Sequence, residues 1–406
     1  MRRVVVTGMG VVSALGHSHE EAFARLRRFE NCVVTVPELA QFKGLNSHLG
    51  SLAGFTRPAH WTRKTVRTMG TVAEYALAAT EQAVADAGLD AATLEGGRCG
   101  VAYGSCSGSI AAHLDLYSMF FEHEIKNITS GTYIKLMPQT CACNLSVHFR
   151  THGRLVPTGT ACTSGSLAIG NAYELIRYGL QDVMLAGGAE EFSPTQVAIF
   201  DTLYATSLRN DAPAATPAPY DVGRDGLVIG EGAGTLVLEE YAHARARGAK
   251  IYAEVVGFCE NTDGTHVTNP NAETMAQCLR GALTDAGLDG AAIGYVNGHG
   301  TATKAGDIAE TTATRAAFGR AVPISSTKSY IGHTLGACGA IEAMVTVACM
   351  NAGWFHPTLN LRRVDPALAH DVVEGEGRAA EVEYAMSNNF AFGGVNTSLV
   401  FRRLRG

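Results

Sequence analysis

The sequence lacks the features that define several large classes of protein. Its 406 residues carry a formal net charge of −6, so no basic excess indicates nucleic acid or an anionic membrane as a partner. No stretch of about eighteen uninterrupted apolar residues occurs, which argues against a transmembrane helix. The ten cysteines have no regular paired spacing, a pattern typical of reduced thiols. We therefore expect a cytoplasmic protein that binds neither nucleic acid nor membrane.

Two incomplete patterns count against a signal peptide and against a bound cofactor. Residues 1–13 begin with a basic pair and continue with valines, but Gly8 and Gly10 interrupt the apolar run and no convincing cleavage site follows. We predict strand segments at residues 4–6 and 11–12 that flank a turn, and the spacing of a dinucleotide loop fails at Ser13. Cys141 and Cys143 have no matching second pair. Neither a metal nor a redox cofactor is therefore expected.

One local pattern occurs twice. A helical pattern over residues 71–87 ends in Asp86-Ala-Gly-Leu-Asp90 and precedes an apolar strand at residues 100–104. A second helix from residue 274 ends in Asp285-Ala-Gly-Leu-Asp289 and precedes a strand at residues 293–297. The offset, 285 − 86 = 199 residues, is close to half the chain. This spacing predicts an internal duplication of one layered α/β unit.

The duplication also predicts the domain boundaries. An arginine- and alanine-rich helix around residues 240–249 lies where the two copies join. We predict an N-terminal half over residues 1–245 and a C-terminal half over residues 246–406. The stretch from about 107 to 153 has no counterpart of similar length in the second half, so we expect it to be an insertion that caps the first.

Cys162 stands at the most informative point of the first half. It directly precedes apolar residues at helical spacing over residues 167–176, and glycines and serines surround it. A buried structural cysteine is the common alternative. At the first turn of a helix, however, free N–H groups and the helix dipole favour a thiolate, so we expect a lowered pKa for this thiol.

Three further glycine-rich or polar turns lie in the second half. His299 stands between Gly298 and Gly300, where the backbone can bend sharply. Lys328 precedes His333 by five positions, and a polar and aromatic loop covers residues 387–396. Each histidine alone could be structural. A thiol, two imidazoles and an amine on four such turns together predict one active site.

These segments resemble a known family. Thr160-Ala-Cys162-Thr-Ser-Gly, Asn297-Gly-His299-Gly-Thr, Lys328-Ser-Tyr-Ile-Gly-His333 and Asn389-Phe-Ala-Phe392-Gly-Gly are similar to motifs of the 3-oxoacyl-(acyl carrier protein) synthases, elongating condensing enzymes of the thiolase superfamily. The resemblance covers essentially the whole chain. It implies a thiolase-like five-layered αβαβα fold made of two duplicated halves, and a homodimer or a heterodimer with a related subunit.

The resemblance also implies a reaction and a role for each motif residue. Cys162 would carry an acyl chain, and decarboxylative Claisen condensation with malonyl-(acyl carrier protein) would extend that chain by two carbons. The backbone N–H groups of Cys162 and Phe392 would form the oxyanion hole. His299 and His333 would donate hydrogen bonds to the malonyl thioester oxygen, and Lys328 would hold the electrostatics and hydrogen bonding around His333. No cofactor is implied, because phosphopantetheine of acyl carrier protein carries the substrates.

Other residues would support this chemistry. Phe392 resembles a gate that moves on acylation, and Glu342 would support the site from behind. The remaining implied contacts are to the pantetheine arm (Thr301, Thr303 and nearby Asn396), to the acyl chain (Cys106 and Ser107) and to acidic carrier protein (Lys64, Arg67 and the weaker candidate Arg209).

The chain departs from the family pattern at four positions. Gly298 stands where the family has Ala or Ser, which should loosen the turn carrying His299. Ala391 replaces a glycine before the gate, which should restrict the gate, and Lys304 replaces a proline. Ser107 is small and slightly polar, which fits a roomy acyl pocket or an unusual acyl chain. The departures leave the reaction type unchanged and the substrate open.

Three alternatives remain beside fatty acid elongation. A ketosynthase of a secondary polyketide or polyene pathway would use the same chemistry. A non-catalytic chain-length partner would lack the nucleophile, whereas Cys162 and both histidines are present. A degradative thiolase would use a second cysteine on the C-terminal loop, and no cysteine follows Cys349.

Overall fold

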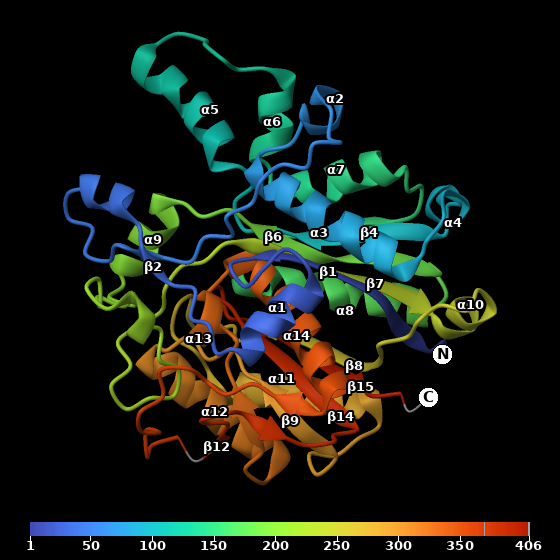
Figure 1. The fold of residues 1–406 in the computed structure, drawn as a ribbon, viewed down its shortest axis with the longest axis vertical. Coiled ribbons are helices and arrows are strands. Elements are labelled where there is room, and N and C mark those ends of the chain that lie inside the picture. Colours follow the sequence, from blue (N-terminus) through green and yellow to red (C-terminus); the bar gives the residue numbers. More distant parts are fainter. Residues whose placement is uncertain (369, 405–406) are drawn as a thin grey trace.

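The computed structural model describes residues 1–368 and 370–404, and one eleven-stranded sheet runs through it (Figure 1). The sheet divides at β1, which pairs over its full length with β7 and only through Val4–Val6 with β8. In spatial order its strands are β12 (Asp371–Val372), β10 (Pro323–Ser325), β9 (Ile293–Asn297), β14 (Tyr384–Phe390), β15 (Val395–Arg402), β8 (Ala253–Thr262), β1 (Val4–Ser13), β7 (Gly232–Glu240), β6 (Val183–Glu190), β4 (Cys99–Gly104) and β5 (Leu155–Thr158).

The two parts of the sheet repeat one strand order and one set of directions. In the first half, β1, β7 and β6 are antiparallel neighbours, and β4 and β5 continue parallel to β6. In the second half, β8, β15 and β14 are antiparallel, and β9 and β10 continue parallel to β14. This position-by-position match confirms the predicted duplication.

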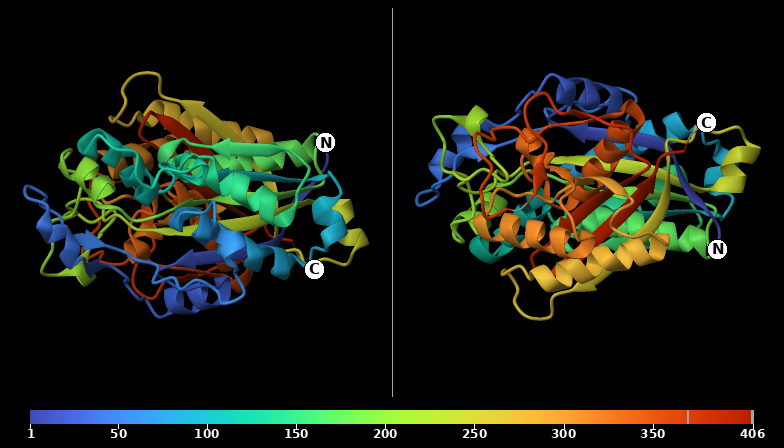
Figure 2. Two further views of the ribbon diagram at one scale, coloured as in Figure 1. Left: turned by 90° about the horizontal axis from the view of Figure 1, so that it is seen from above. Right: turned by 90° about the horizontal axis from the view of Figure 1, so that it is seen from below.

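Helices complete five layers. Helices α3 (Thr71–Ala87) and α7 (Thr140–Phe149) cover the outer face of the first half-sheet, and α11 (Ala272–Ala286) and α12 (Lys304–Phe318) form the outer layer beyond the second. Between the half-sheets, α8 (Ser164–Arg177) and α14 (Cys338–Ala352) contact each other and strands of both halves. In Figure 2, α11, coloured gold, lies on the opposite side of the molecule from the blue helix α1 (His19–Arg27). The expected αβαβα order is confirmed.

The repeated Asp-Ala-Gly-Leu-Asp segments are helix ends. Helix α3 ends at Gly88, with φ of +62°, and α11 ends at Gly287, with φ of +68°. Glycine adopts this left-handed conformation without the steric penalty that a side chain adds, and it ends a helix for that reason. The sequence repeat therefore marks the same helix end, at a left-handed glycine, in both halves.

The predicted turn at residues 7–10 is wrong. Residues Val4–Ser13 form one strand with an irregularity between Val6 and Gly8. Both glycines serve helix packing: a Cβ on Gly8 would lie 2.1 Å from the carbonyl oxygen of Ala83, and one on Gly10 would lie 1.9 Å from that of Ala79. Helix α3 therefore approaches the strand at backbone contact distance.

The expected insertion forms the upper lobe of Figure 1. Helices α5 (Ile110–Glu122) and α6 (Ser130–Leu136) pack on each other there, and α7 returns the chain to α3 and β4. The remaining elements connect the layers: β2 (Val34–Thr35), β3 (Leu49–Gly50), α2 (Arg63–Val66), α4 (Ala91–Glu95), α9 (Pro194–Asp201), α10 (Tyr241–Ala246), α13 (Lys328–Ile331), β11 (Trp354–Phe355) and β13 (Arg378–Ala379), with 3-10 turns at Pro37–Gln41, Ala161–Thr163, Pro213–Ala215 and Leu335–Ala337.

Within the described residues, the segment Leu335–Ala352 is the one helical stretch long and apolar enough to cross a membrane. It comprises a short turn and α14, and 83 % of it is buried inside the protein. Because α14 lies between the two half-sheets, its apolar side chains face other protein on all sides. The composition is that of a central core helix.

Candidate active site

Cys162 lies on a strained turn between β5 and α8. The turn, Ala161–Thr163, leads directly into α8, and Ala161 has a φ of +49°, which a non-glycine residue seldom adopts. The side chain of Cys162 is only 4 % exposed, yet it lines a cavity of about 620 Å³. The strained residue therefore turns a buried thiol toward open space, and such strain is common where geometry serves function.

The expected lowering of the Cys162 pKa is wrong. Burial raises the pKa of this thiol to about 11. The charge of Lys328 and the backbone N–H groups of Phe392 and Cys162 act in the opposite direction but do not outweigh it. Loss of hydration at a buried position thus exceeds the helix-terminus effect, and Cys162 rests as a neutral thiol. Both predicted oxyanion-hole donors nevertheless converge on its sulfur.

His333 faces Cys162 with a defined ring nitrogen. Its Nε2 lies 3.0 Å from Cys162 Sγ, and the N–H of Leu335 donates to its Nδ1 at 3.2 Å. Burial, and then the charge of Lys328, hold the pKa of His333 well below its usual value, so the ring is neutral. A neutral ring that accepts at Nδ1 carries its proton on Nε2. His333 therefore presents an N–H donor to the cavity.

His299 is arranged in the same way. Lys328 Nζ lies 3.2 Å from its Nδ1, and Asn389 Nδ2 lies 3.4 Å from the same atom. Burial, Lys328 and His333 keep the pKa of His299 well below its usual value. Because both neighbours donate to Nδ1, the ring proton lies on Nε2. The site thus contains two neutral imidazoles with their N–H groups at Nε2.

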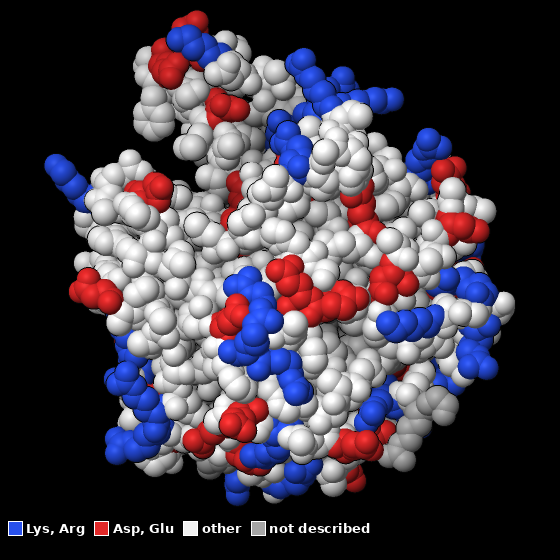
Figure 3. Space-filling model, in the orientation of Figure 1, with Lys and Arg blue, Asp and Glu red and all other residues white. Residues whose placement is uncertain are grey.

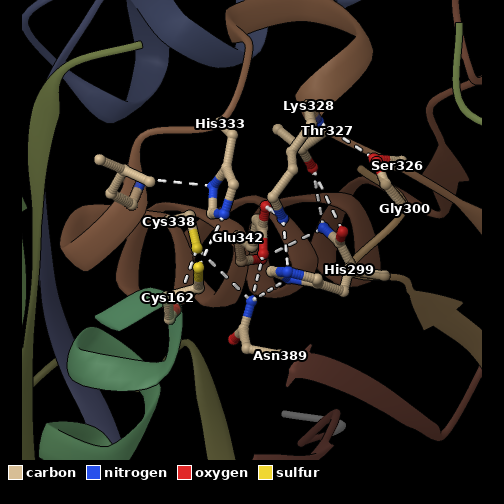
Figure 4. Close-up of polar contacts among 12 residues, drawn as sticks. Cys162, His299, Gly300, Ser326, Thr327, Lys328, His333, Cys338, Glu342 and Asn389 are labelled. Carbon is tan, nitrogen blue, oxygen red and sulfur yellow. Dashed lines mark hydrogen bonds and ion pairs between the residues drawn. The ribbon is translucent and has the colours of Figure 1, made fainter. Parts of the chain in front are cut away.

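Lys328 contacts a different histidine from the one expected. Its ammonium hydrogen-bonds to His299 and pairs with Glu342 Oε1 at 2.5 Å, whereas it affects His333 through its charge alone (Figure 4). Burial favours the neutral amine, but the carboxylate of Glu342 outweighs it and raises the pKa of Lys328. The expected electrostatic influence on His333 is present, and the hydrogen bond goes to His299.

Sequence analysis assigned no role to two members of this network, although it quoted Asn389 as part of a motif. Asn389 Nδ2 donates to Glu342 Oε2 at 2.7 Å, and Cys338 Sγ lies 3.2 Å from the carbonyl oxygen of Cys162 (Figure 4). Asn389 belongs to the polar run Ser387–Asn389, fully buried at the end of β14, and this polarity in a core strand was the available signal. Nothing in the spacing of Cys338 distinguishes it from a core cysteine.

The turn carrying His299 is tightly packed, so the expected loosening at Gly298 is wrong. A Cβ on Gly298 would lie 2.2 Å from the hydroxyl oxygen of Tyr220, which fills the place of a side chain. Glu310 accepts from the N–H groups of His299 and Gly300 at 2.5 and 2.7 Å. Tyr220 and Glu310 thus hold the turn from below, and sequence analysis assigned a role to neither.

The cavity brings together the residues expected at the gate and at the pantetheine arm. Thr301, Thr303 and Asn396 all line it. Phe392 also lines it and stacks on Phe200, with ring centroids 5.0 Å apart. The left-handed positions of the gate loop are Gly393 and Gly394, so the methyl group of Ala391 meets no backbone strain in this state.

Other expected residues lie outside the cavity wall. Cys106 packs against the apolar cluster that includes Cys162, but neither it nor Ser107 lines the cavity. Lys64 and Arg67 are exposed at α2, where Figure 3 shows basic side chains gathered. Arg209 is held by Asp225 at 3.3 Å and by the carbonyl oxygens of Ala215 and Gly223. It braces its own loop and is a poor docking residue.

A metal ion is disfavoured although suitable atoms are close together. Cys162, His299 and His333 offer ligand atoms within 4.8 Å of one another, and so do His299, Cys338 and Glu342. The ammonium of Lys328 lies 3.2 Å from His299 and contacts Glu342. This buried positive charge opposes a second cation.

A buried thiol at a cavity, two N–H imidazoles and two convergent backbone donors are the arrangement of an acyl-transferring enzyme, here on a thiolase-like fold. Residues 1–244 match the family model "Beta-ketoacyl synthase, N-terminal domain", and residues 252–362 match "Beta-ketoacyl synthase, C-terminal domain". The chain belongs to the beta-ketoacyl synthase family. The resemblance found in the sequence is confirmed.

Known relatives agree with this assignment. A Vibrio cholerae protein named 3-oxoacyl-(acyl-carrier-protein) synthase 2 is 40 % identical over 411 residues, which cover 99 % of each chain. A crystal structure of a beta-ketoacyl synthase from Burkholderia phymatum is 55 % identical, with a TM-score of 0.98 and full coverage of both chains. The ishigamide ketosynthase/chain length factor is 30 % identical, with a TM-score of 0.91 and full coverage of both chains.

Proposed function

We propose that this chain extends acyl chains on acyl carrier protein by two carbons in fatty acid synthesis, through decarboxylative condensation with a malonyl thioester. The observation that carries the proposal is the convergence of two Nε2–H donors and two backbone N–H donors around the Cys162 sulfur. Each donor faces the position where negative charge would develop, and preorganised donors of this kind are the main source of catalysis in acyl transfer.

In the loading step, the sulfur of Cys162 attacks the carbonyl carbon of an acyl thioester. The backbone N–H groups of Cys162 and Phe392 hold the oxyanion of the tetrahedral intermediate. The bond to the phosphopantetheine sulfur then breaks, and the proton lost by Cys162 leaves on that departing thiol. Because the pKa of Cys162 is about 11, the four donors must favour the thiolate at the moment of attack.

In the condensation step, the malonyl thioester oxygen accepts hydrogen bonds from the Nε2–H groups of His299 and His333. The carbon–carbon bond to the carboxylate breaks, carbon dioxide leaves, and the two donors stabilise the resulting enolate. Its carbon attacks the acyl carbon on Cys162, whose sulfur leaves and regains a proton. Burial, and then the charge of Lys328, keep both imidazoles neutral, since each of them lowers the pKa of both rings.

The cavity supplies a binding site for the substrate arm. Thr301 and Thr303, whose hydroxyl oxygens lie 2.9 Å apart, hydrogen-bond the phosphopantetheine chain, with Asn396 nearby. Phe392 swings away from Phe200 when an acyl chain enters. The substrates arrive on carrier protein, and the enzyme needs no cofactor of its own.

The proposal includes the partners of the chain. Acyl carrier protein docks through its acidic surface on Lys64 and Arg67 of the exposed α2 region. A second copy pairs with β5, which lies next to β4 at the edge of the sheet that the described residues form, and covers the exposed side chains of Leu114, Phe121 and Ile125. The location we propose is the cytoplasm. A related chain-length partner is the alternative subunit, as in the ishigamide pair.

Intact mass spectrometry tests the function. We expect a saturated medium-chain acyl carrier protein to leave an acyl adduct on Cys162, and malonyl carrier protein to remove it as a product two carbons longer. Absence of an adduct on a protein whose Cys162 still reacts with a thiol reagent would contradict the proposal. Adducts from unsaturated primers alone would favour the alternative, a polyketide or polyene ketosynthase.

A further inference from the structure

Cys259 and Cys278 form a thiol pair outside the active site. Cys259 lies on β8 and Cys278 on α11, which packs against that strand. Cys278 Sγ lies 3.3 Å from the carbonyl oxygen of Cys259 and within hydrogen-bonding reach of the Cys259 sulfur. Cys259 is partly exposed, whereas Cys278 is fully buried. One accessible thiol thus stands directly beside an inaccessible one.

Strand and helix are close enough at this point for a covalent link. A Cβ on Gly257 would lie 2.4 Å from the carbonyl oxygen of Ala282, so the two backbones are in contact. One turn beyond Cys278, a Cβ on Gly281 would lie 2.4 Å from Cys259 Sγ. The absence of a side chain at Gly281 leaves the room that the Cys259 sulfur occupies. Disulfides need such short separations of the two backbones.

Cys259 is also the thiol whose acidity is best suited to oxidation. The hydrogen bond from Cys278 lowers its pKa, against burial and the nearby carboxylates of Asp285, Glu260 and Glu174. In the nine other cysteines, Cys162 included, the pKa is raised. An accessible thiol of lowered pKa beside a second thiol is the arrangement of redox-sensing cysteine pairs.

The pair brackets a wall of the active-site cavity. Residues 263, 266–270 and 275, all between the two cysteines, line the cavity that holds Cys162. Val267 also accepts a hydrogen bond from the N–H of Gly393, next to Phe392, at 2.8 Å. A link between Cys259 and Cys278 would therefore fix the base of a loop that touches the gate segment.

We propose that Cys259 and Cys278 are a reversible oxidation site for hydrogen peroxide, and that the disulfide they form restrains this cavity loop. The Cys259 thiolate attacks the peroxide, the O–O bond breaks, and a sulfenic acid and water form. The sulfur of Cys278 then attacks that of Cys259, the S–O bond breaks, and a second water leaves with the disulfide. Two thiols lose two electrons, and hydrogen peroxide is reduced to two waters. A thiol reductant restores the pair.

Peptide mass spectrometry tests the site independently of enzymatic activity. The full-length Cys162→Ala protein, in which the active-site thiol cannot react, is treated with a small excess of hydrogen peroxide, alkylated under denaturing conditions and digested. Trypsin releases residues 251–280, which contain Cys259 and Cys278 and no other cysteine. We expect this peptide to lose two hydrogens, to resist alkylation, and to yield two linked fragments when cleaved after Glu260 and Glu273. Dithiothreitol should reverse all three changes.

Variants separate a resolving role for Cys278 from general oxidation. Cys278→Ser should leave Cys259 as a sulfenic acid that dimedone traps, and Cys259→Ser should leave Cys278 reduced. Cys32→Ser, at a partly exposed cysteine of raised pKa, is the matched control and should keep the disulfide. Oxygen addition to Cys259 in the otherwise unchanged peptide, with no linked form, would overturn the proposal.

The restraint has its own readout in the protein with Cys162 intact. Once the disulfide is present and the peptide of Cys162 is verified as reduced, a bulky thiol reagent should modify Cys162 roughly threefold more slowly or worse, because fewer molecules have an open loop. Cys259→Ser protein treated in the same way should show no slowing. An equal rate in the oxidised and reduced proteins would refute the restraint on the loop.

Discussion

The same turn occurs at the start of both central helices, but the two copies carry different chemistry. Ala161–Thr163 precedes α8, and Leu335–Ala337 precedes α14. The first residue of each turn has a left-handed backbone, with φ of +49° at Ala161 and +47° at Leu335. The residue that follows is Cys162, the proposed nucleophile, in the first copy and Gly336 in the second. A Cβ on Gly336 would lie 2.8 Å from Glu190 Oε2, so the second copy has no room for a side chain.

The segments before the turns explain the difference. Only residues 159–160 separate β5 from the first turn, whereas residues 326–334 separate the equivalent β10 from the second. The longer connection contains α13, and it carries both Lys328 and His333. The first copy thus supplies the sulfur and an N–H group, and the enlarged second copy supplies the charge and an imidazole. The two copies thus share the turn and the helix that follows it, and the extra residues of the second copy add the charge of Lys328 and the imidazole of His333.

The largest expected effect comes from removing the thiol of Cys162, which the first turn has and the second turn lacks. Cys162→Ala should show no acyl adduct by intact mass spectrometry after incubation with acyl carrier protein substrate, because no other thiol lines the cavity. Cys338→Ala is the matched control, since it removes a neighbouring thiol that contacts the Cys162 carbonyl oxygen and the Asn389 amide but does not line the cavity, and it should still be acylated. An adduct on Cys162→Ala would mean that a different residue is the nucleophile.

The donors of the second half should give the next largest effect. His299→Ala or His333→Ala should slow condensation by about 10²–10³-fold, the loss typical of one oxyanion donor. Acyl loading should fall much less, since it uses the N–H groups of Cys162 and Phe392. Rapid-quench measurement separates acyl adduct formation from release of carbon dioxide. A variant that lost only the loading step would reverse the division of roles between the halves.

The features that could be predicted from the sequence were those in which the local backbone conformation determines the residue type. Gly88 and Gly287 end equivalent helices, so their spacing revealed the duplication. The motifs of Cys162, His299 and Lys328 lie on turns, where residue type and backbone geometry are linked. The prediction at Gly8 was wrong because glycine serves two purposes that the sequence alone does not distinguish. It can form a turn, or, as here, it can let a helix pack directly against the strand backbone.

What could not be predicted depends on tertiary burial. The pKa of Cys162 rises because residues of both halves bury it, among them Phe200 and Leu335, and no pattern near Cys162 contains that information. Asn389 contacts Glu342 across 47 positions and Tyr220 contacts Glu310 across 90, whereas Glu310 and His299 are 11 positions apart. The hydrogen bond between Tyr220 and Glu310 exists only once the two halves have packed, and the other two form within the folded second half.

The contact between the central helices should give a smaller effect, on stability. A Cβ on Gly339 would lie 2.6 Å from the backbone nitrogen of Ser166, and one on Gly165 would lie 2.9 Å from that of Ala340. Gly339→Ala should lower the free energy of unfolding by about 1–3 kcal/mol, as overpacking does. Gly131→Ala in α6, with no neighbour closer than 3.4 Å, is the control and should not destabilise. Denaturant unfolding that ranks the two variants equally would contradict the close approach.

The smallest expected effect is a shift in the pH at which Cys162 reacts. It tests the comparison most directly, because it measures how strongly Lys328 of the second half changes the pKa of Cys162 in the first. With a pKa of about 11, Cys162 should react with iodoacetamide about tenfold faster for each pH unit between roughly 7 and 10, as the thiolate fraction rises. Its tryptic peptide, residues 155–177, contains no other cysteine, so labelling is unambiguous.

Lys328→Met should shift that labelling profile to higher pH, since the Lys328 charge lowers the pKa of Cys162. At a fixed pH near 8 the variant should therefore label more slowly than the unaltered protein. The direction is diagnostic. If the variant labelled faster, steric relief around the sulfur would outweigh the lost charge, and Lys328 would act on the first turn by packing. A profile that levels off below pH 8 would show instead that the donors of both turns together overcome the burial of the thiol.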